Sequence, residues 1–354
     1  MAMGKRGFLY VFGAIVLFST IEVVSKYLQS GMGTGKPLGA DQVASLRFML
    51  GGLLLLPFAV GGGRGSLAAR AVRNDPVPLV LLGVVGVFLT FFLFHQGVER
   101  ASASTAAVVF SGNPIFTSLL AVLLLKERLR AVGWLGIGLG FLGALAAVTG
   151  FHLSGLFSRD DFLGGILVLS SALTWSAYTV YGKRYSQVYG GLTVSFLSIV
   201  AGSAMFALLL GVRGGWGELA SYDAGTWGWL LYLGMVTVGI GYLLYFEGMR
   251  QVPASRGASL FYLKPILALL LAHYALGEPV TYALVFATVM VAAGVLLVTL
   301  TRGEGSVGDG HRGASRRPGG RPAAAWLQRL TEGEEASKGA ALRPRPRLGR
   351  RSRE

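Results

Sequence analysis

Long hydrophobic segments alternate with short polar loops through the first 300 residues of the chain. Ten segments are long enough to cross a hydrocarbon core of ~30 Å, which takes about 20 helical residues. We expect them at 7–28, 41–60, 77–98, 102–125, 131–149, 163–182, 191–211, 227–249, 254–276 and 280–300. The pattern predicts an all-α integral membrane protein with ten transmembrane helices.

The composition agrees with this interpretation, because 53% of the residues are hydrophobic and only 14% are charged. A soluble protein has about 25% charged residues. The chain contains no cysteine, and its four histidines show no metal-binding spacing. We therefore expect no disulfide, no metal site and no cofactor.

One stretch of the sequence occurs twice. Gly97, Pro114, Glu127 and Gly143 recur 151 residues later as Gly248, Pro265, Glu278 and Gly294. A shared spacing of four anchors indicates a duplication, and a repeat this long and this apolar is typical of one half of a transporter. Residues 1–149 form the first predicted repeat, 150–162 a linker and 163–300 the second repeat.

Each repeat contains five segments, an odd number, so the first segment and its counterpart, 163–182, cross the membrane in opposite directions. The chain is therefore predicted to be an inverted repeat. Such a fold can open to either side when its halves exchange conformations. Alternating access is the natural hypothesis.

Lys and Arg are unevenly distributed over the loops. Twelve lie on one side of the predicted membrane: Lys5, Arg6, Arg64, Arg70, Arg73, Lys126, Arg128, Arg130, Lys183, Arg184, Arg250 and Arg256. The other side has Lys36, Arg100, Arg159 and Arg213. The positive-inside rule then places both termini in the cytoplasm and the chain in the cytoplasmic (inner) membrane.

The net charge of +15 is thus a membrane signature, and we expect no nucleic-acid partner. Residues 301–354 are rich in Gly, Arg, Pro and Ala, and are predicted to be a disordered basic cytoplasmic tail. That tail either contacts anionic lipid headgroups or only adds solubility. The other expected partners are a small-molecule substrate and membrane lipids, with the protein a monomer or a homodimer.

Ionisable residues inside the predicted helices mark a transport path by default, because burying a charge at the bilayer centre costs about 2.5 to 3.5 kcal/mol. Glu22 and Lys26 lie four residues apart, one turn after Ser19. They either neutralise each other or line the cavity, and Glu22 is a candidate for proton coupling. Glu247 is a second candidate, with an ordinary position at the membrane surface as the alternative.

Arg47 lies six residues inside the second segment, where it either reaches lipid headgroups or lines the cavity. Lys264 immediately precedes Pro265, and Asn113 precedes Pro114 in the first repeat. The prolines predict helix kinks. We expect Asn113 and Lys264 to face a central cavity and contact substrate or the opposite half.

Aromatic and imidazole side chains complete the expected cavity. The candidates are His95, Trp175, Tyr178, Tyr242 and Tyr245. Such a lining suits amphipathic or mostly apolar small solutes. Glu127 and Glu278 follow the proline-containing segments and precede the next ones, so both are predicted to be structural caps or gate contacts rather than substrate ligands.

Several stretches resemble the ten-helix EamA-type members of the drug/metabolite transporter superfamily. They are LLLKERL and ALGEPV at the ends of the doubled segments, FSTIEVVSK with its counterpart TWSAYTVYGK, and Arg47 in ASLRFML. The resemblance covers residues 7–300. It implies transport of small metabolites, amino acids or toxic analogues, proton- or gradient-linked, through a cavity between two five-helix halves.

We therefore predict a secondary-active transporter, in the first place an exporter, that works by alternating access. Lys264 would favour anionic substrates. A flippase of lipid-linked or lysolipid substrates is the alternative within transport. A membrane-embedded enzyme is a remote alternative, since the sequence shows no nucleophile with a base and no paired membrane aspartates.

Overall fold

The computed structural model describes residues 2–32, 35–125, 129–151, 160–252 and 260–302. All regular secondary structure in these ranges is helical, and no strand occurs within them. The prediction of an all-α protein is confirmed. Most of the expected linker, and the tail from residue 303 onward, lie outside the described residues.

The first repeat contains α1 (Ala2–Ser19), α2 (Ile21–Gln29), α3 (Ala40–Val60), α4 (Arg64–Asn74), α5 (Pro76–Gly83), η1 (Val84–Leu89), α6 (Thr90–Arg100), α7 (Ala103–Ser111), α8 (Asn113–Leu125) and α9 (Ala131–Thr149). The second contains α10 (Asp160–Tyr189), α11 (Gly191–Val212), η3 (Gly217–Ser221), α12 (Ala224–Leu231), η4 (Tyr232–Ile240), α13 (Gly241–Gln251), η5 (Leu260–Tyr262), α15 (Leu263–Leu276) and α16 (Tyr282–Arg302).

Nine described helical runs are long and apolar enough to span a bilayer: Arg6–Gln29, Ala40–Val60, Pro76–Arg100, Ala103–Leu124, Ala131–Thr149, Asp160–Tyr189, Gly191–Val212, Ala224–Met249 and Tyr282–Leu300. They correspond to nine of the ten expected segments. The remaining one is the shorter apolar helix Leu260–Leu276, and residues 254–259 of the expected segment lie outside the described part of the chain.

Several spans are built from two helical pieces. The first breaks at Thr20, whose hydroxyl binds the Leu17 carbonyl at 2.7 Å. The fourth breaks at Gly112, one residue before Asn113 and Pro114, where the sequence predicts a kink. The third and eighth contain π-helical turns, η1 and η4, at overlapping positions of the two repeats. Such turns are frequent at functional sites, and no sequence signal indicates them.

The two repeats pack against each other through equivalent glycines. A Cβ at Gly51 of α3 would lie 2.5 Å from Val238 of the eighth span, so the two helices cross in close contact. In the exchanged pair, a Cβ at Gly202 of α11 would lie 2.5 Å from Val87 of the third span. Both members of one contact are 151 residues from their counterparts in the other. The same crossing is therefore made twice, with the repeats swapped.

The direction of the spans follows from their contacts. Gly7, near the start of α1, lies against Gly248 at the end of α13, and Gly164, near the start of α10, lies against Gly97 in α6. The far end of the first span is also at the end of α6, because Lys26 Nζ is 2.8 Å from the Ala101 carbonyl. The first span thus ends where the sixth begins, and the repeats are inverted.

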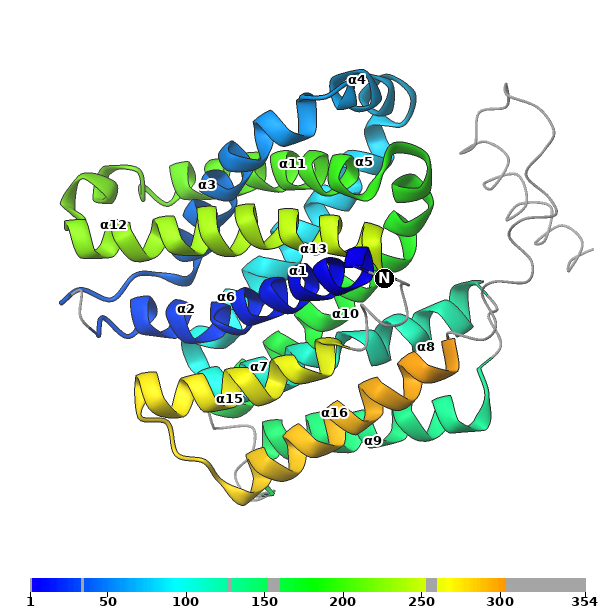
Figure 1. Cartoon of the computed structure of the whole chain (residues 1–354). Helices are drawn as coiled ribbons and strands as arrows, with labels where there is room; N and C mark the ends of the chain where they lie inside the picture. The colour runs from blue at the N-terminus through cyan, green and yellow to red at the C-terminus, as the bar shows by residue number, and fades with distance from the viewer. Residues whose placement is uncertain (1, 33–34, 126–128, 152–159, 253–259, 303–354) are drawn as a thin grey trace, which may run out of the picture. The chain divides into compact units, whose positions relative to one another are not determined.

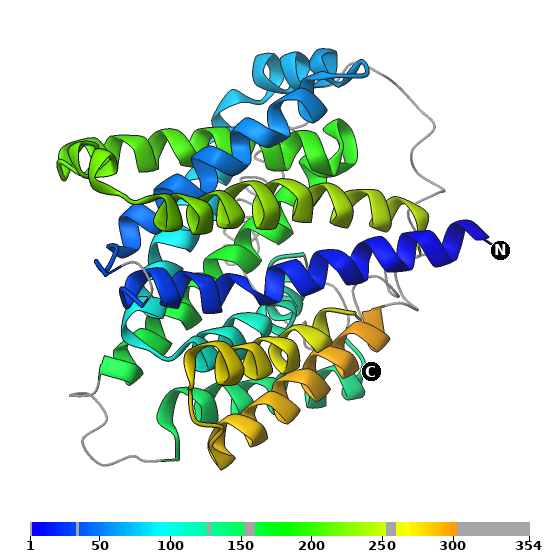
Figure 2. The same cartoon turned by 60° about the vertical axis from the view of Figure 1, so that its left-hand side comes forward.

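Figure 1 shows the first span running from the N-terminal marker through α1 into α2, with α13 alongside. In Figures 1 and 2, α16 (orange) and α9 (teal) lie side by side. Gly136 and Gly143 of α9 allow this pair to approach closely, because Cβ atoms there would lie 2.9 Å from the Gly294 carbonyl and 2.8 Å from Val291. We call the end where α1 begins the N-terminal face and the other end the Lys26 face.

We predict that Gly51→Ala and Gly202→Ala both lower the melting temperature of the purified protein. Alanine is normally favoured over glycine in a helix by about 1 kcal/mol, but overpacking these crossings costs about 1–3 kcal/mol. Gly138→Ala is the matched control, because no described atom lies within 4 Å of the place that its added methyl group would take. Equal melting temperatures for the three variants would contradict the packing of these crossings.

Candidate functional site

Among the described residues, four acidic, basic or imidazole side chains are buried within the apolar helices. They are Glu22 of α2, Arg47 of α3, His95 of α6 and Lys264 of α15, with exposed fractions of 0%, 2%, 0% and 5%. We call these four the buried polar cluster. A membrane protein places such groups together or around a cavity, because each is costly to bury alone.

Glu22 and Lys264 form an ion pair between the two repeats. The Lys264 Nζ donates to Glu22 Oε1 at 2.5 Å and lies 5.1 Å from the centroid of the Phe110 ring. The second carboxylate oxygen of Glu22 is buried without a hydrogen-bond partner among the described residues. Breaking a buried pair of this kind by removing one member typically costs 3–5 kcal/mol, about the stability of a small domain.

Arg47 and His95 form the other half of the cluster. Arg47 Nη1 lies 3.5 Å from His95 Nε2, and the guanidinium carbon is 5.0 Å from the ring centroids of Phe48 and Phe91. Arg47 Nε and His95 Nδ1 are buried without partners in the part of the chain that the structure places. Arg47 is therefore buried in the protein and does not extend to the headgroups, while its place in a cavity lining stays a prediction.

The face of α2 that carries Glu22 continues as a polar stripe. Ser25 and Gln29, three and seven residues after Glu22, are buried as well. The Gln29 side chain donates to the His95 carbonyl at 3.0 Å, so the stripe reaches α6. Ser25 Oγ and Gln29 Oε1 have no partner among the described atoms. The sequence shows that Ser25 and Gln29 share a helix face with Glu22. Both are neutral, however, and the sequence analysis selected charged residues.

Lys26 does not pair with Glu22. Its Nζ donates to the carbonyls of Val98, Glu99 and Ala101 at 3.1, 2.9 and 2.8 Å. Lys26 thus binds the C-terminal end of α6, where free carbonyls and the helix dipole favour a cation. The alternative in which Glu22 and Lys26 neutralise each other is not what the structure shows.

Glu278 binds the N-terminus of α7, which begins in the same turn that Lys26 contacts. Its carboxylate accepts hydrogen bonds from the backbone N–H groups of Ala103 and Ser104, at 2.6 and 2.9 Å, and from the Ser104 hydroxyl at 2.6 Å. Glu278 is thus a helix cap, as the sequence suggests, but it caps α7 of the other repeat rather than the helix that follows it. Glu127 lies outside the described residues.

Further contacts join the repeats at the Lys26 face. Gln42 donates to Glu218 at 2.8 Å, and Arg213 forms an ion pair with Asp41 at 3.3 Å. The hydrogen bond from Gln42, followed by the charge of Lys36, lowers the pKa of Glu218 below its ordinary value. The contact of Glu218 is therefore fully present at neutral pH and is lost as the pH falls through that lowered pKa.

Two aromatic groups repeat the same geometry. Trp175 meets Phe91 edge to face at 5.6 Å and 73°, and Phe18 meets Tyr242 at 5.8 Å and 73°. Phe94 with Phe110, and Tyr245 with Phe261, are the matching pairs at 4.9 and 5.7 Å. The first group contacts both buried cations, through Phe91 and Phe110. Trp175 also contacts Tyr178 at 5.1 Å, and the Tyr178 hydroxyl lies 3.4 Å from Ser195 Oγ.

Equivalent residues differ in exposure. Phe91, Phe94 and His95 are buried, whereas their counterparts Tyr242, Tyr245 and Phe246 are partly exposed. The first three lie in the half of the third span towards the Lys26 face, and their counterparts lie towards the N-terminal face. Among these equivalent residues, burial is thus greater towards the Lys26 face.

The remaining predicted site residues have structural contacts. The Asn113 carbonyl accepts a hydrogen bond from the Ser176 hydroxyl of α10 at 3.0 Å, which ties the proline kink to the other repeat. Glu247 is exposed near the end of α13 and accepts from Gln251 at 2.9 Å. It is therefore outside the buried polar cluster. No group of three metal-ligating side chains occurs among the residues that the structure places.

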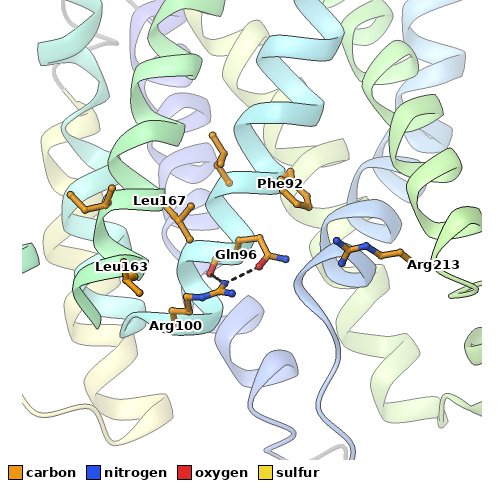
Figure 3. Close-up of a pocket in the computed structure, with 8 residues that line it drawn as sticks. Phe92, Gln96, Arg100, Leu163, Leu167 and Arg213 are labelled. Atoms are coloured by element: carbon orange, nitrogen blue, oxygen red, sulfur yellow. Dashed lines mark hydrogen bonds between the residues drawn. The ribbon is translucent and has the colours of Figure 1, made fainter. Parts of the chain in front are cut away.

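A surface cavity of about 570 Å³ lies elsewhere, and none of the cluster residues lines it. Figure 3 shows Arg100 bonded to Gln96 on one side of this cavity and Arg213 on the other, with Phe92, Leu163 and Leu167. Both arginines already have acidic neighbours, Glu99 and Asp41. The buried polar cluster is the stronger candidate for the functional site.

Comparison with known proteins gives a family for this architecture. The model of the EamA-like transporter family matches residues 5–149 and 162–300, which together are most of the chain. The chain belongs to the EamA-like transporter family. It is a multi-pass membrane transporter, as predicted from the doubled segments.

Relatives of this EamA-like transporter have the same kind of name. An uncharacterized transporter of Clostridium kluyveri is 28% identical over 83% of this chain and 93% of its own length. The uncharacterized inner membrane transporter YedA of Escherichia coli K12 is 28% identical over 84% and 93%. One solved structure aligns with a TM-score of 0.57 at 23% identity, covering 84% of this chain and 98% of the other, and it supports the fold alone.

We predict that Glu278→Gln loosens the Lys26 face, because an amide cannot accept from the α7 N-terminus with a full negative charge. The loss is about 1 kcal/mol. The chain has no cysteine, so Ala103→Cys, at a fully buried position, provides a single reporter. Its maleimide labelling should become faster when Glu278→Gln is added. Glu99→Gln, which removes an exposed acid from the same turn, should leave the rate unchanged, and equal rates in both would argue against the cap.

Proposed function

We propose that this EamA-like transporter is a secondary carrier that moves small organic solutes by alternating access, in the first place as an exporter. The observation that carries the proposal is the Glu22–Lys264 pair, which is buried between two inverted repeats. An ion pair inside the membrane is expensive to maintain for packing alone, since apolar residues of the same volume serve at least as well. An ion pair that substrate or a proton can open has a role in transport that an apolar contact cannot fill.

Coupling to protons is assigned to Glu22. Its free oxygen, Oε2, has no hydrogen-bond partner among the described residues, so a proton can be added there without breaking another contact first. Protonation removes the charge that holds Lys264 and thereby weakens the link between the repeats. Glu247 is a weaker candidate for this role, because it is exposed and already bonded to Gln251.

The orientation that we propose places both termini in the cytoplasm of a cell whose inner membrane contains the protein. Loop cations support this assignment, and the name of the Escherichia coli relative is consistent with it. The Lys26 face is then the external one. The contacts of Glu278, Glu218 and Arg213 at that face support a form closed to the outside.

The orientation predicts the labelling of two single-cysteine variants in intact cells. Met32→Cys, on the Lys26 face, should react with a membrane-impermeant maleimide added outside. Ser66→Cys, on the N-terminal face, should react only after permeabilisation. Both positions are accessible in the fold. The reverse pattern would contradict the assignment.

Counterflow in proteoliposomes is the test of the carrier. Preloading with a transported solute should accelerate uptake of the labelled solute several-fold, which a channel or an enzyme does not produce. Glu22→Gln should retain exchange while transport loses its dependence on pH, because glutamine has no proton to release. A full pH dependence in that variant would remove Glu22 as the coupling residue. Movement of a fluorescent lysolipid in the same vesicles would instead support the flippase alternative.

A further inference from the structure

Arg47 is a buried cation without an acidic partner in the described part of the chain. The ion pairs between described residues are Lys36–Glu218, Arg100–Glu99, Arg213–Asp41 and Lys264–Glu22. The acid of the buried polar cluster, Glu22, is thus already held by Lys264. A guanidinium stays protonated in proteins, so the cluster retains one uncompensated positive charge. Buried charges are normally paired, which makes this arrangement incomplete without an anion.

The neighbours of Arg47 stabilise its charge but do not cancel it. Phe48 and Phe91 provide cation–π contacts, worth about 0.5 to 2 kcal/mol each. The contact with His95 Nε2, at 3.5 Å, is at the limit of a hydrogen bond. Arg47 Nε points to no acceptor among the described residues. The polar edge of the guanidinium is therefore the part left for a ligand.

Several unsatisfied polar atoms belong to the buried polar cluster and to the polar stripe on α2. Glu22 Oε2, Ser25 Oγ, Gln29 Oε1, Arg47 Nε and His95 Nδ1 are all buried without partners in the described ranges. More than about 90% of buried polar groups in proteins are hydrogen-bonded, so these five atoms are donors and acceptors available to a ligand. Gln29 is bonded to the backbone of His95, which brings α2 and α6 together at this point.

We propose that Arg47, with His95 and Gln29 beside it, forms the subsite that holds the anionic group of the solute, a single carboxylate. The inference rests on the proposed carrier function, because the bound anion is a transported solute only if the protein is a carrier. One negative charge neutralises the cluster while Glu22 and Lys264 stay paired. A dianion leaves a net negative charge in the membrane, and a cation adds to the positive one. Arginine suits this ligand because its planar donors match the two oxygens of a carboxylate.

The second repeat has no copy of this subsite. Ser198 stands 151 residues after Arg47, Phe246 after His95 and Ile199 after Phe48. The carrier therefore binds one carboxylate at a time. Lys264, which the sequence suggests as the anion-binding group, is occupied by Glu22 and acts on the anion only when that pair opens.

The test measures binding to the purified full-length protein with acid and amide probes of the same shape: acetate and acetamide, benzoate and benzamide, phenylacetate and phenylacetamide. For at least one pair, the wild type should bind the acid at least ten-fold more tightly than the amide, measured by concentration-dependent thermal stabilisation. Arg47→Gln should reduce that preference to about one. Arg73→Gln, which removes an exposed arginine from α4, should retain it.

Two results would overturn the subsite: a wild type that prefers no acid in any pair, or a monodisperse Arg47→Gln protein that keeps the preference. If Arg47→Gln does not survive purification, Arg47→Lys replaces it, since it keeps the charge but loses the planar donors, and the preference should then fall at least three-fold. Acid-selective binding without trans-stimulation in counterflow would refute the carrier and leave the subsite. Counterflow of the amide as fast as the acid would refute the subsite and leave the carrier.

Discussion

The cost of placing charge inside a lipid bilayer governs this protein. Glu22 and Lys264 reduce that cost by forming an ion pair. Because they belong to opposite repeats, each repeat alone would contain a buried charge without its partner. The close glycine crossings bring the two repeats within reach of each other without bulky side chains between them. Geometry and electrostatics therefore depend on one condition, which is that the two halves stay docked.

At the Lys26 face, the same bundle uses backbone dipoles as well as paired side chains. Lys26 lies on the free carbonyls that end α6, and Glu278 lies on the free N–H groups that begin α7. A cation and an anion thus bind the two sides of one short turn, each at the helix end whose partial charge it complements.

Most of the fold was predictable from the sequence, because apolar length and the doubled anchors are long-range signals that do not depend on any one residue. The membrane spans, the duplication and the kink beside Asn113 and Pro114 followed from them. The cluster residues Glu22, Arg47, His95 and Lys264 also stood out, because charge in an apolar segment is conspicuous. Their pairing did not follow, since the neighbour of Glu22 four residues away was Lys26, while its actual partner is in the other repeat. Gln29 and Phe48 were missed because neutral side chains at helical spacing look like ordinary packing, and the π-helical turns of η1 and η4 have no sequence signature.

The two repeats share their crossings and their aromatic geometry but not their chemistry. In the aligned repeats, Glu22 corresponds to Thr179 and Lys264 corresponds to Asn113. Each of these two charged residues therefore has a neutral counterpart. In the alternating access that we propose, a symmetric scaffold would have two end states of equal free energy, related by the two-fold axis in the membrane plane. This scaffold does not, because its charges must enter a different environment in each. The empty carrier that we propose therefore prefers one orientation, so the solute concentration that half-saturates it differs between the two sides, while the gradients alone set the direction of net flux.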